Sequence, residues 1–256
     1  MPIRHDTLRA TLEEVTGGGS DVLVVHSSLS SCGYFTAGAE KVLDALAERC
    51  DTLCLPTHSY CYPVSPDAAG LVFEARTTPS QNGRLTELFR ARVGVSRSIH
   101  ATHSLAVSGS RAGTICDRHY QCNSPCGAGT PYDRLVRQQA SVLMFGVSFH
   151  YYTFFHTAEF MSGSSHAFEH GTIDRLRVLD ETGRLRECPS QRQSRAPMRF
   201  AEAGELLERV GLARGVPLGR DRLVYVPDAS KAHEFLMERL KRVPDFLRQS
   251  CRSDLR

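Results

Sequence analysis

Tryptophan is absent from the 256-residue chain, and no stretch approaches the roughly 20 consecutive apolar residues that a membrane-spanning helix needs. The polar segment that follows Met1 lacks the apolar core of a secretory signal, so we expect a cytoplasmic protein without a membrane partner. An excess of one charge is also lacking, because 31 basic and 28 acidic residues leave a formal net charge of +3. With so little charge and few aromatic stacking platforms, we expect no nucleic-acid partner.

Paired cysteine spacings are lacking as well. The nine cysteines are an odd number, which does not fit a disulfide framework. Cys116, Cys122 and Cys126 form the closest cluster, but the five and three residues between them differ from the two short pairs of a zinc site. We therefore predict small buried thiols and no metal site. Cys32 could be a nucleophile, but we interpret it as a packing residue.

The hydrophobic pattern predicts one compact α/β domain over residues 1–256. Apolar runs predict strands at 21–27, 51–59 and 140–148, and amphipathic patterns predict helices at 38–50, 83–92 and 230–243. A strand, a helix and a strand in succession favour a mainly parallel or mixed sheet. Between residues 172 and 200 the composition alternates around a Glu-Thr-Gly turn, which predicts a small β-hairpin excursion.

Each of the three predicted strands ends in a group of polar residues. These groups are His26 to Ser31, Thr57 to Ser59, and the segment from Gly146 to Glu159. In open parallel sheets, ligands bind outside the carboxyl ends of the strands. The sequence therefore predicts one site shared by the three strand ends.

The serine-rich segment HSSLSS, residues 26–31, offers hydroxyls with little bulk. Glycine-rich dinucleotide and P-loop motifs are absent, but a phosphate or pyrophosphate could accept hydrogen bonds from these hydroxyls and from backbone N–H groups. The alternative is that the serines only end a strand and form local turns. Arg97, in RSIHATHS, could likewise pair with a phosphate or be an ordinary solvated side chain.

The segment FFHTAEF places His156 and Glu159 three residues apart, on one face if the segment is helical. A carboxylate that binds one imidazole nitrogen fixes the tautomer and makes the other nitrogen a better base. The alternative is an ordinary polar pair on a helix surface, because this spacing alone is a weak signal.

Six motifs in order resemble the aminoglycoside N3-acetyltransferase family, which is distinct from the GNAT acetyltransferases. They are VVHSSLSSCGYFTAGAEKVLDAL, LCLPTHS, TTPSQNGRLTELFR, VSRSIHATHSLAVSG, GAGTPYDRLV followed by VLMFGV, and TFFHTAEF. They cover most of residues 20–165, and a weaker match runs from residue 204 to the end. The resemblance departs at Ala101 and Thr130, where the family usually has a proline after the histidine and a serine before the proline.

The resemblance implies an αβα layered sandwich and direct acetyl transfer from acetyl-CoA to a small-molecule amine, with no metal. It implies that His156 is the general base and that Glu159 orients it. The implied cofactor-binding residues are His26, Ser27, Ser28, Leu29, Ser30, Thr57, Arg97 and Ser98. Oligomeric state is left open between a monomer and a homodimer.

The acceptor amine is left open between two classes. The family acts on the 3-amino group of aminoglycosides, whose ammonium groups need carboxylates in the pocket. The candidate substrate-binding residues are Tyr60, Asp67, Glu74 and Glu169, in segments that are poor in acidic residues, and the sequence pI is 8.4. A less cationic amine, acylated in a biosynthetic tailoring step, fits this charge better. An inactive CoA-binding protein, or a cysteine-rich metal-binding protein, is a further alternative.

Overall fold

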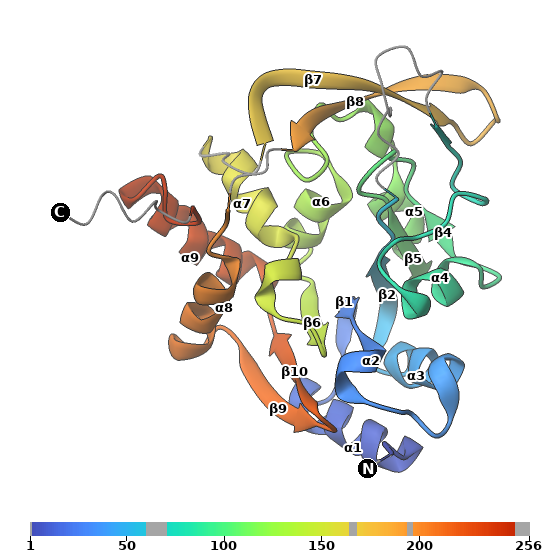
Figure 1. Cartoon of the computed structure of the whole chain (residues 1–256), viewed down its shortest axis with the longest axis vertical. Helices are drawn as coiled ribbons and strands as arrows, with labels where there is room; N and C mark the ends of the chain where they lie inside the picture. Colours follow the sequence, from blue (N-terminus) through green and yellow to red (C-terminus); the bar gives the residue numbers. More distant parts are fainter. Residues whose placement is uncertain (1, 60–70, 164–167, 194–196, 249–256) are drawn as a thin grey trace.

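The computed structural model describes residues 2–59, 71–163, 168–193 and 197–248. A seven-stranded sheet forms the centre of the molecule (Figure 1). In spatial order its strands are β4 (Ser96–Arg97), β5 (Leu105–Gly109), β2 (Cys50–Pro56), β1 (Ser20–Ser27), β6 (Ser141–Phe145), β10 (Asp221–Val226) and β9 (Arg214–Leu218).

The middle of the sheet is parallel and its margins are antiparallel. Strand β1 pairs in parallel with β2 on one side and with β6 on the other, with Val24 opposite Cys54 and Ser27 opposite Phe145. Strands β5 and β10 run antiparallel to these neighbours. The carboxyl ends of β2, β1 and β6 therefore meet at one edge of the sheet.

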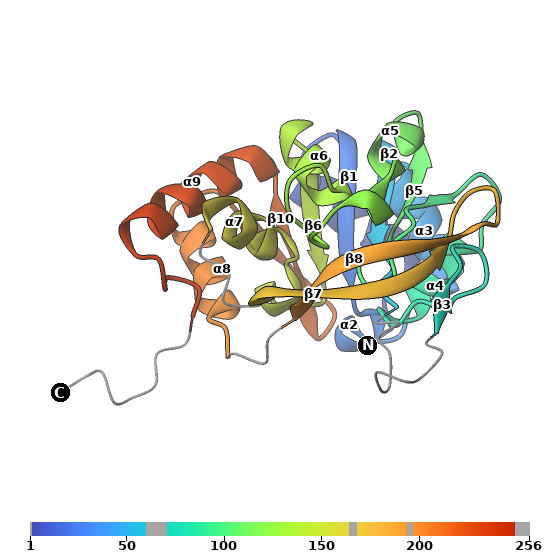
Figure 2. The same ribbon diagram turned by 90° about the horizontal axis from the view of Figure 1, so that it is seen from above.

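Helices cover both faces of the sheet, and Figure 2 shows α7, α8 and α9 on one side and α3 and α4 on the other. One core lies against α5 (Ala112–Cys116), α6 (Pro131–Arg137), α7 (Phe154–Ser162), α8 (Phe200–Arg209) and α9 (Ala229–Arg242). The other lies against α1 (His5–Thr16), the short α2 (Leu29–Cys32), α3 (Gly38–Ala47) and α4 (Arg84–Arg90). This arrangement confirms the predicted αβα sandwich.

Strand β1 supplies both cores because successive side chains on a strand point to opposite faces. Val22 and Val24 belong to the first core, whereas Leu23 and Val25 belong to the second. All four are buried. An uninterrupted apolar run is therefore what a central strand covered on both faces requires.

The predicted hairpin is present with different bounds. It consists of β7 (Phe168–Leu179) and β8 (Leu185–Gln193), and the short β3 (Val72–Phe73) adds to β7 as a third strand. The hairpin ends before residue 200 because Phe200 begins α8. Figure 1 shows it across the end of the molecule opposite the N-terminus. Leu176 and Val178 of β7 and Cys188 of β8 form a small core with Phe73 and Ile99.

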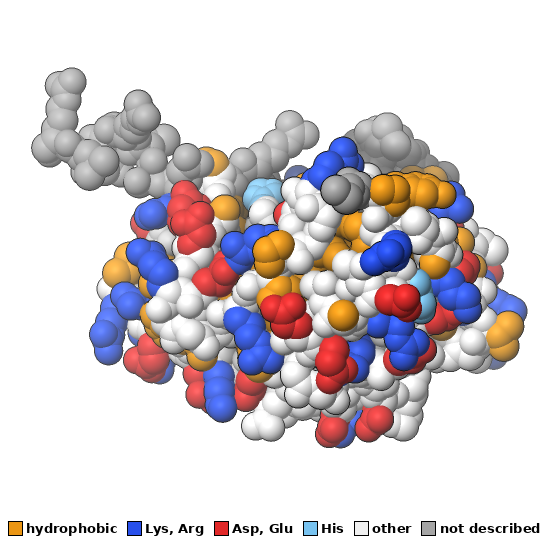
Figure 3. Space-filling model, turned by 90° about the horizontal axis from the view of Figure 1, so that it is seen from below, with side chains coloured by type: hydrophobic (Ala, Val, Ile, Leu, Met, Phe, Trp, Pro, Cys, Tyr) orange, Lys and Arg blue, Asp and Glu red, His pale blue; other side chains and the backbone are white. Residues whose placement is uncertain are grey.

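Surface charge and helix hydrophobicity indicate whether the protein has features typical of nucleic-acid or membrane binding. On the face shown in Figure 3, basic and acidic side chains alternate and do not gather into a patch of one sign. Within the described ranges, the helices include none with the length and apolar character needed to span a membrane.

Gly146, directly after β6, lies against the serine segment. Its φ is +63°, and a Cβ placed there would lie 2.6 Å from Cys32 Sγ and 2.7 Å from the Ser28 carbonyl oxygen. Only glycine fits both the left-handed backbone and this contact. The closeness of the serine segment to β6 therefore depends on a residue without a side chain.

We predict that Gly146→Ala destabilises the protein by about 3 kcal/mol, the sum of left-handed strain and overpacking. Gly183→Ala is the matched control, because Gly183 has a φ of +76° with nothing within 4 Å of the added Cβ. The control should cost about 1 kcal/mol, and in a chain of this size each kcal/mol lowers the Tm by about 2–4 °C. Equal Tm losses in thermal unfolding would show that the contact with Ser28 and Cys32 carries no strain.

Candidate active site

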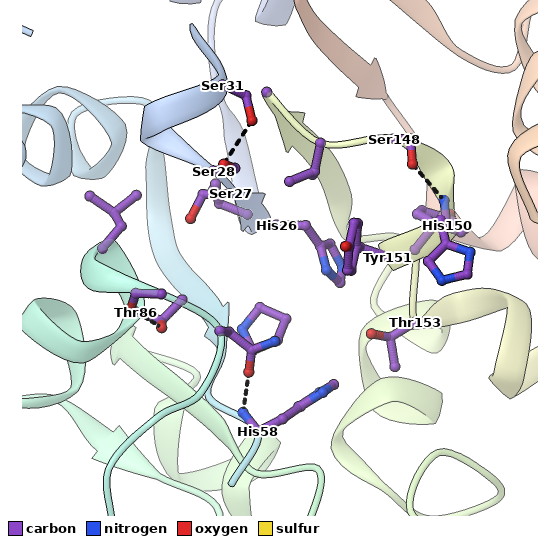
Figure 4. A pocket seen from close by; sticks show the side chains of 18 of the residues that line it. His26, Ser27, Ser28, Ser31, His58, Thr86, Ser148, His150, Tyr151 and Thr153 are labelled. Carbon is purple, nitrogen blue, oxygen red and sulfur yellow. Dashed lines mark hydrogen bonds between the residues drawn. The ribbon is translucent and has the colours of Figure 1, made fainter. Parts of the chain in front are cut away.

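A cavity of about 1010 Å³ opens at the edge where β2, β1 and β6 end. The described residues of its lining come from all three strand ends, as the sequence predicted for a shared site. They include His26 to Ser31 after β1, Pro56 and His58 at β2, and Gly146 to Ser148 after β6. Figure 4 shows Ser27, Ser28 and Ser31 on one side, Tyr151 and Thr153 on the other, and His26 between them.

The serine segment lines the cavity through residues 26–31. Ser28 Oγ lies 2.8 Å from Ser31 Oγ and 3.3 Å from Ser30 Oγ, so these hydroxyls bond to one another. Ser27 Oγ is buried and has no hydrogen-bond partner among the described residues. The four serines of the segment therefore contribute small side chains with hydroxyls to the cavity lining.

His156 and Glu159 lie together on α7, at the wall opposite the serine segment. His156 Nδ1 is 2.9 Å from Glu159 Oε2, and the Glu159 carboxylate is fully buried. The His156 ring lines the cavity, and its centroid lies 4.9 Å from that of Phe200. Because a carboxylate accepts hydrogen bonds, Nδ1 is the donor in this contact, and in the tautomer with its one proton on Nδ1 the lone pair is on Nε2.

Two copies of the tripeptide Thr-His-Ser meet beside the cavity. Residues 57–59 follow β2 and residues 102–104 precede β5, and the two segments exchange backbone hydrogen bonds from Thr57 N to Ser104 O and from Ser59 N to Thr102 O. The rings of His58 and His103 have centroids 4.5 Å apart, and both line the cavity. His58 Nε2 is also 2.9 Å from the hydroxyl of Tyr132 on α6.

Behind the cavity, His100 and His119 stack with ring centroids 4.4 Å apart. His119 Nε2 donates to the Pro125 carbonyl oxygen at 3.1 Å, so its Nδ1 accepts from the Ser98 hydroxyl. His100 Nδ1 accepts the backbone N–H groups of Thr102 and His103. This pattern assigns one neutral tautomer to each ring.

Burial keeps these histidines uncharged. Desolvation lowers the pKa of His26 and that of His119 to about 3. It also lowers the pKa of His58, His100 and His103 well below the ordinary value, and the neighbouring histidines add to the effect. The inner wall of the cavity is therefore polar but neutral at pH 7.

Arg97, Ser98 and Thr57 lie behind the cavity lining rather than in it, which differs from the expectation that they touch a cofactor. Arg97 Nε donates to Thr57 Oγ1 and to Ser104 Oγ, each at 3.0 Å, and its Nη2 donates to the Thr57 carbonyl oxygen. Ser98 is bonded to His119. Protein oxygens therefore occupy donors that the sequence suggested for a phosphate.

Of the four expected substrate-binding residues, Glu74 is the one whose side chain the structure describes. Tyr60 and Asp67 lie outside the described residues. Glu169 falls in β7, and its side chain also lies outside what the structure describes. Glu74 lies away from the lining, and its carboxylate accepts the hydroxyl of Thr77 at 2.6 Å.

Several lining residues were missed by the sequence reasoning. Phe200, Met198 and Pro197 come from the segment that leads into α8, far along the chain from the strand ends. No local pattern marks them. The repeated Thr-His-Ser, in contrast, is visible in the sequence and could have indicated His58 and His103 as a pair.

Thiols and carboxylates do not form an evident metal site. The seven cysteines in the described part of the chain are free, and burial raises the pKa of Cys116 to about 12. Across residues 2–59, 71–163, 168–193 and 197–248, no group of three or more His, Cys, Asp or Glu side chains is placed to hold a metal ion.

Comparison with known proteins gives consistent matches. Residues 24–241 match the family model described as aminoglycoside 3-N-acetyltransferase. Aminoglycoside N(3)-acetyltransferase VII of Streptomyces paromomycinus is 27% identical over 175 residues, which is 62% of this chain and 60% of that protein. The chain spans 57 to 62% of the length of the curated relatives it matches.

Solved structures match over almost the whole chain. Aminoglycoside acetyltransferase AAC(3)-Xa has a TM-score of 0.79 at 25% identity and covers 97% of this chain and 95% of its own. The structure of AAC-IIIb, solved as a binary complex with CoASH, has a TM-score of 0.76 at 21% identity, covering 94% of this chain and 97% of its own.

We predict that stability falls steeply as the pH drops below about 6.5. The five buried histidines have lowered pKa values in the folded chain, so the unfolded chain binds more protons once the pH is below its own histidine pKa. Their stabilisation is present above pH 6.5 and is lost below it, at up to about 1.4 kcal/mol per pH unit for each group.

Urea unfolding at pH 7, 6 and 5 measures this slope. His100→Gln should reduce the dependence of the free energy of unfolding on pH by the contribution of one of the five histidines. His150→Gln, the matched variant at an exposed histidine, should leave this dependence unchanged. A free energy of unfolding that stays constant between pH 7 and pH 5 would contradict the prediction.

Proposed function

The chain belongs to the aminoglycoside 3-N-acetyltransferase family, and from that premise we propose that it transfers an acetyl group from acetyl-CoA to a primary amine. The observation that carries the proposal is the 2.9 Å contact between His156 Nδ1 and Glu159 Oε2 at a cavity whose other wall is the serine segment. One wall offers a general base, and the other offers donors for a second substrate. Two substrates can therefore meet in one space.

The polar atoms and the volume of the cavity support acetyl-CoA as the co-substrate. Ser27 Oγ and His26 Nε2 are buried without partners among the described residues, so they are available to a ligand. The volume of about 1010 Å³ is large enough for an extended co-substrate arm and an acceptor. The AAC-IIIb structure, which shares the fold, contains CoASH.

In the proposed reaction, His156 accepts a proton from the attacking amine through Nε2, and Glu159 holds the ring and balances the positive charge that forms on it. Acetyl-CoA supplies a thioester whose carbonyl carbon is the electrophile. A carbon–nitrogen bond forms, the carbon–sulfur bond breaks with its electron pair on sulfur, and the proton on His156 passes to that sulfur. A positioned base contributes about 10²- to 10⁴-fold, and the approach of the two substrates adds further acceleration.

Thr57, Arg97 and Ser98 support the cavity wall in this proposal rather than contact the co-substrate. Arg97 donates to Thr57 and Ser104, the neighbours of His58 and His103, and Ser98 is hydrogen-bonded to His119, which stacks on His100 behind the lining. Their contribution is the position of His58 and His103.

Two classes of acceptor fit different observations. Family membership favours the 3-amino group of an aminoglycoside. Among the described lining residues, Asp221 is the one carboxylate, and Arg84 opposes it in sign. That lining favours a less cationic amine, because a polycationic sugar needs several carboxylates to pair with its ammonium groups.

We predict CoA release when the protein is incubated with acetyl-CoA and a primary amine. A thiol-release assay against gentamicin, kanamycin and a panel of mono-amino sugars separates the two acceptor classes. A micromolar KM for an aminoglycoside supports the first class, and a higher kcat/KM for the mono-amines supports the second. An absence of CoA release with every amine, while acetyl-CoA binds in calorimetry, would contradict acetyl transfer.

We predict that His156→Ala lowers kcat by about 10²- to 10⁴-fold and leaves acetyl-CoA affinity unchanged, because the base is lost and the serine wall is intact. Glu159→Gln should lower kcat by a smaller factor, since an amide still accepts from Nδ1 but no longer balances the charged ring. Steady-state kinetics and calorimetry with acetyl-CoA measure both. Full activity of His156→Ala would exclude this residue as the base.

A further inference from the structure

His26 is the histidine of β1 and the first residue of the serine segment. It lies opposite Met144 of β6 and shares a strand face with Val22 and Val24, two and four residues earlier. That face is the one covered by α7, which carries His156. The two imidazoles therefore lie on the same side of the sheet, and both line the cavity.

The His26 side chain is 94% buried, since its exposed fraction is 6%. Its Nε2 is buried and has no hydrogen-bond partner among the described residues. The ring centroid of Tyr152 lies 6.4 Å from that of His26, and the Tyr152 hydroxyl is also without a partner among the described residues. Buried polar atoms are almost always satisfied in folded proteins, so a ligand in the cavity is the natural partner for this ring.

The protonation state of His26 indicates which kind of ligand atom it can bind. Burial lowers the pKa of His26 to about 3, so the ring is neutral and carries one N–H donor throughout the pH range in which amines react. A thioester carbonyl oxygen is an acceptor only. Acyl transfer places negative charge on this oxygen, and a preorganised neutral donor stabilises that charge without giving up a proton.

The position of His26 agrees with this partner. Figure 4 shows the ring extending into the pocket between the serine side and the side of Tyr151 and Thr153. An acetyl group held between the serine segment and His156 occupies the space between these walls. His26 projects from the strand that leads into the serine segment, and it faces that space from the floor formed by the sheet.

We propose that His26 donates a hydrogen bond to the carbonyl oxygen of the acetyl thioester and stabilises the charge that develops there. The inference rests on the proposed acetyl transfer and adds a second catalytic histidine to it. As the amine nitrogen bonds to the carbonyl carbon, the π pair moves onto this oxygen. When the pair returns, the carbon–sulfur bond breaks and sulfur takes its electrons. His26 keeps its proton throughout, and the amine proton leaves through His156.

Two variants of similar size separate this role from co-substrate binding. His26→Leu removes the donor and should lower kcat by about 10²- to 10³-fold, with the KM for acetyl-CoA changed far less. His26→Gln keeps a neutral N–H donor and should recover part of that loss. A rise in KM with an unchanged kcat in both variants would make His26 only a binding residue and overturn the proposal.

A measurement without turnover tests the contact itself. Infrared difference spectra of acetyl-CoA with a ¹³C-labelled carbonyl, bound without an acceptor amine, report hydrogen bonding to that oxygen. The carbonyl stretch should lie at lower frequency in the wild type and in His26→Gln than in His26→Leu. Identical frequencies in the three proteins would overturn the proposal even if the variants lose activity.

An NMR experiment on the wild-type protein tests the contact even if a variant does not fold. In a protein with ¹⁵N-labelled histidine, acetyl-CoA should shift the His26 ring N–H resonance in the NMR spectrum. CoASH lacks the thioester carbonyl and should not reproduce this shift. The same change with both ligands, or no change, would overturn the inference. A carbonyl shift in a protein that acetylates no amine would instead contradict the proposed function and leave the His26 contact in place.

Discussion

The buried guanidinium of Arg97 fixes the geometry of one wall of the cavity. It joins the two Thr-His-Ser segments through Thr57 and Ser104, and His58 and His103 are the adjacent residues in each segment. It also binds the carbonyl oxygens of Ala75 and Thr78 and lies over the Phe73 ring, 4.8 Å from its centroid. A guanidinium does not give up its proton on burial, so its acceptors must remain in place around it. The positions of the lining histidines follow from that demand.

The histidines themselves show how desolvation sets the chemistry of the site. Five imidazoles lie buried at or behind the cavity, and burial is the first cause of the lowered pKa in each. Charging one ring would place an unpaired cation among its neighbours, so the whole group stays neutral. The arrangement supplies donors and acceptors of fixed direction without the electrostatic cost of buried charge.

Much of the fold could be predicted from local pattern. The apolar run of β1 and the helix-strand alternation gave the αβα layers, and the polar residues at three strand ends gave the position of the cavity. Arg97 could not be placed in this way, because an arginine that binds a phosphate and one that binds carbonyl oxygens look alike in sequence. Phe200 and the residues just before it could not be predicted as cavity residues either, because only tertiary packing brings the start of α8 to His156. The pairing of the hairpin with β3 was not predicted either, because a two-residue strand has no sequence signal.

In the proposed reaction, the two walls of the cavity divide the requirements of acyl transfer between them. The serine segment comes close to β6 because Gly146 has no side chain, so the donor side is shaped by small residues. The opposite wall carries the His156–Glu159 pair, whose carboxylate is the buried negative charge behind the base. Glu159 binds Nδ1 of the ring and is not among the described residues that line the cavity. An amine must be neutral to attack, and in the proposed reaction Nε2 of His156 takes the proton that the amine loses as its bond to the carbonyl carbon forms.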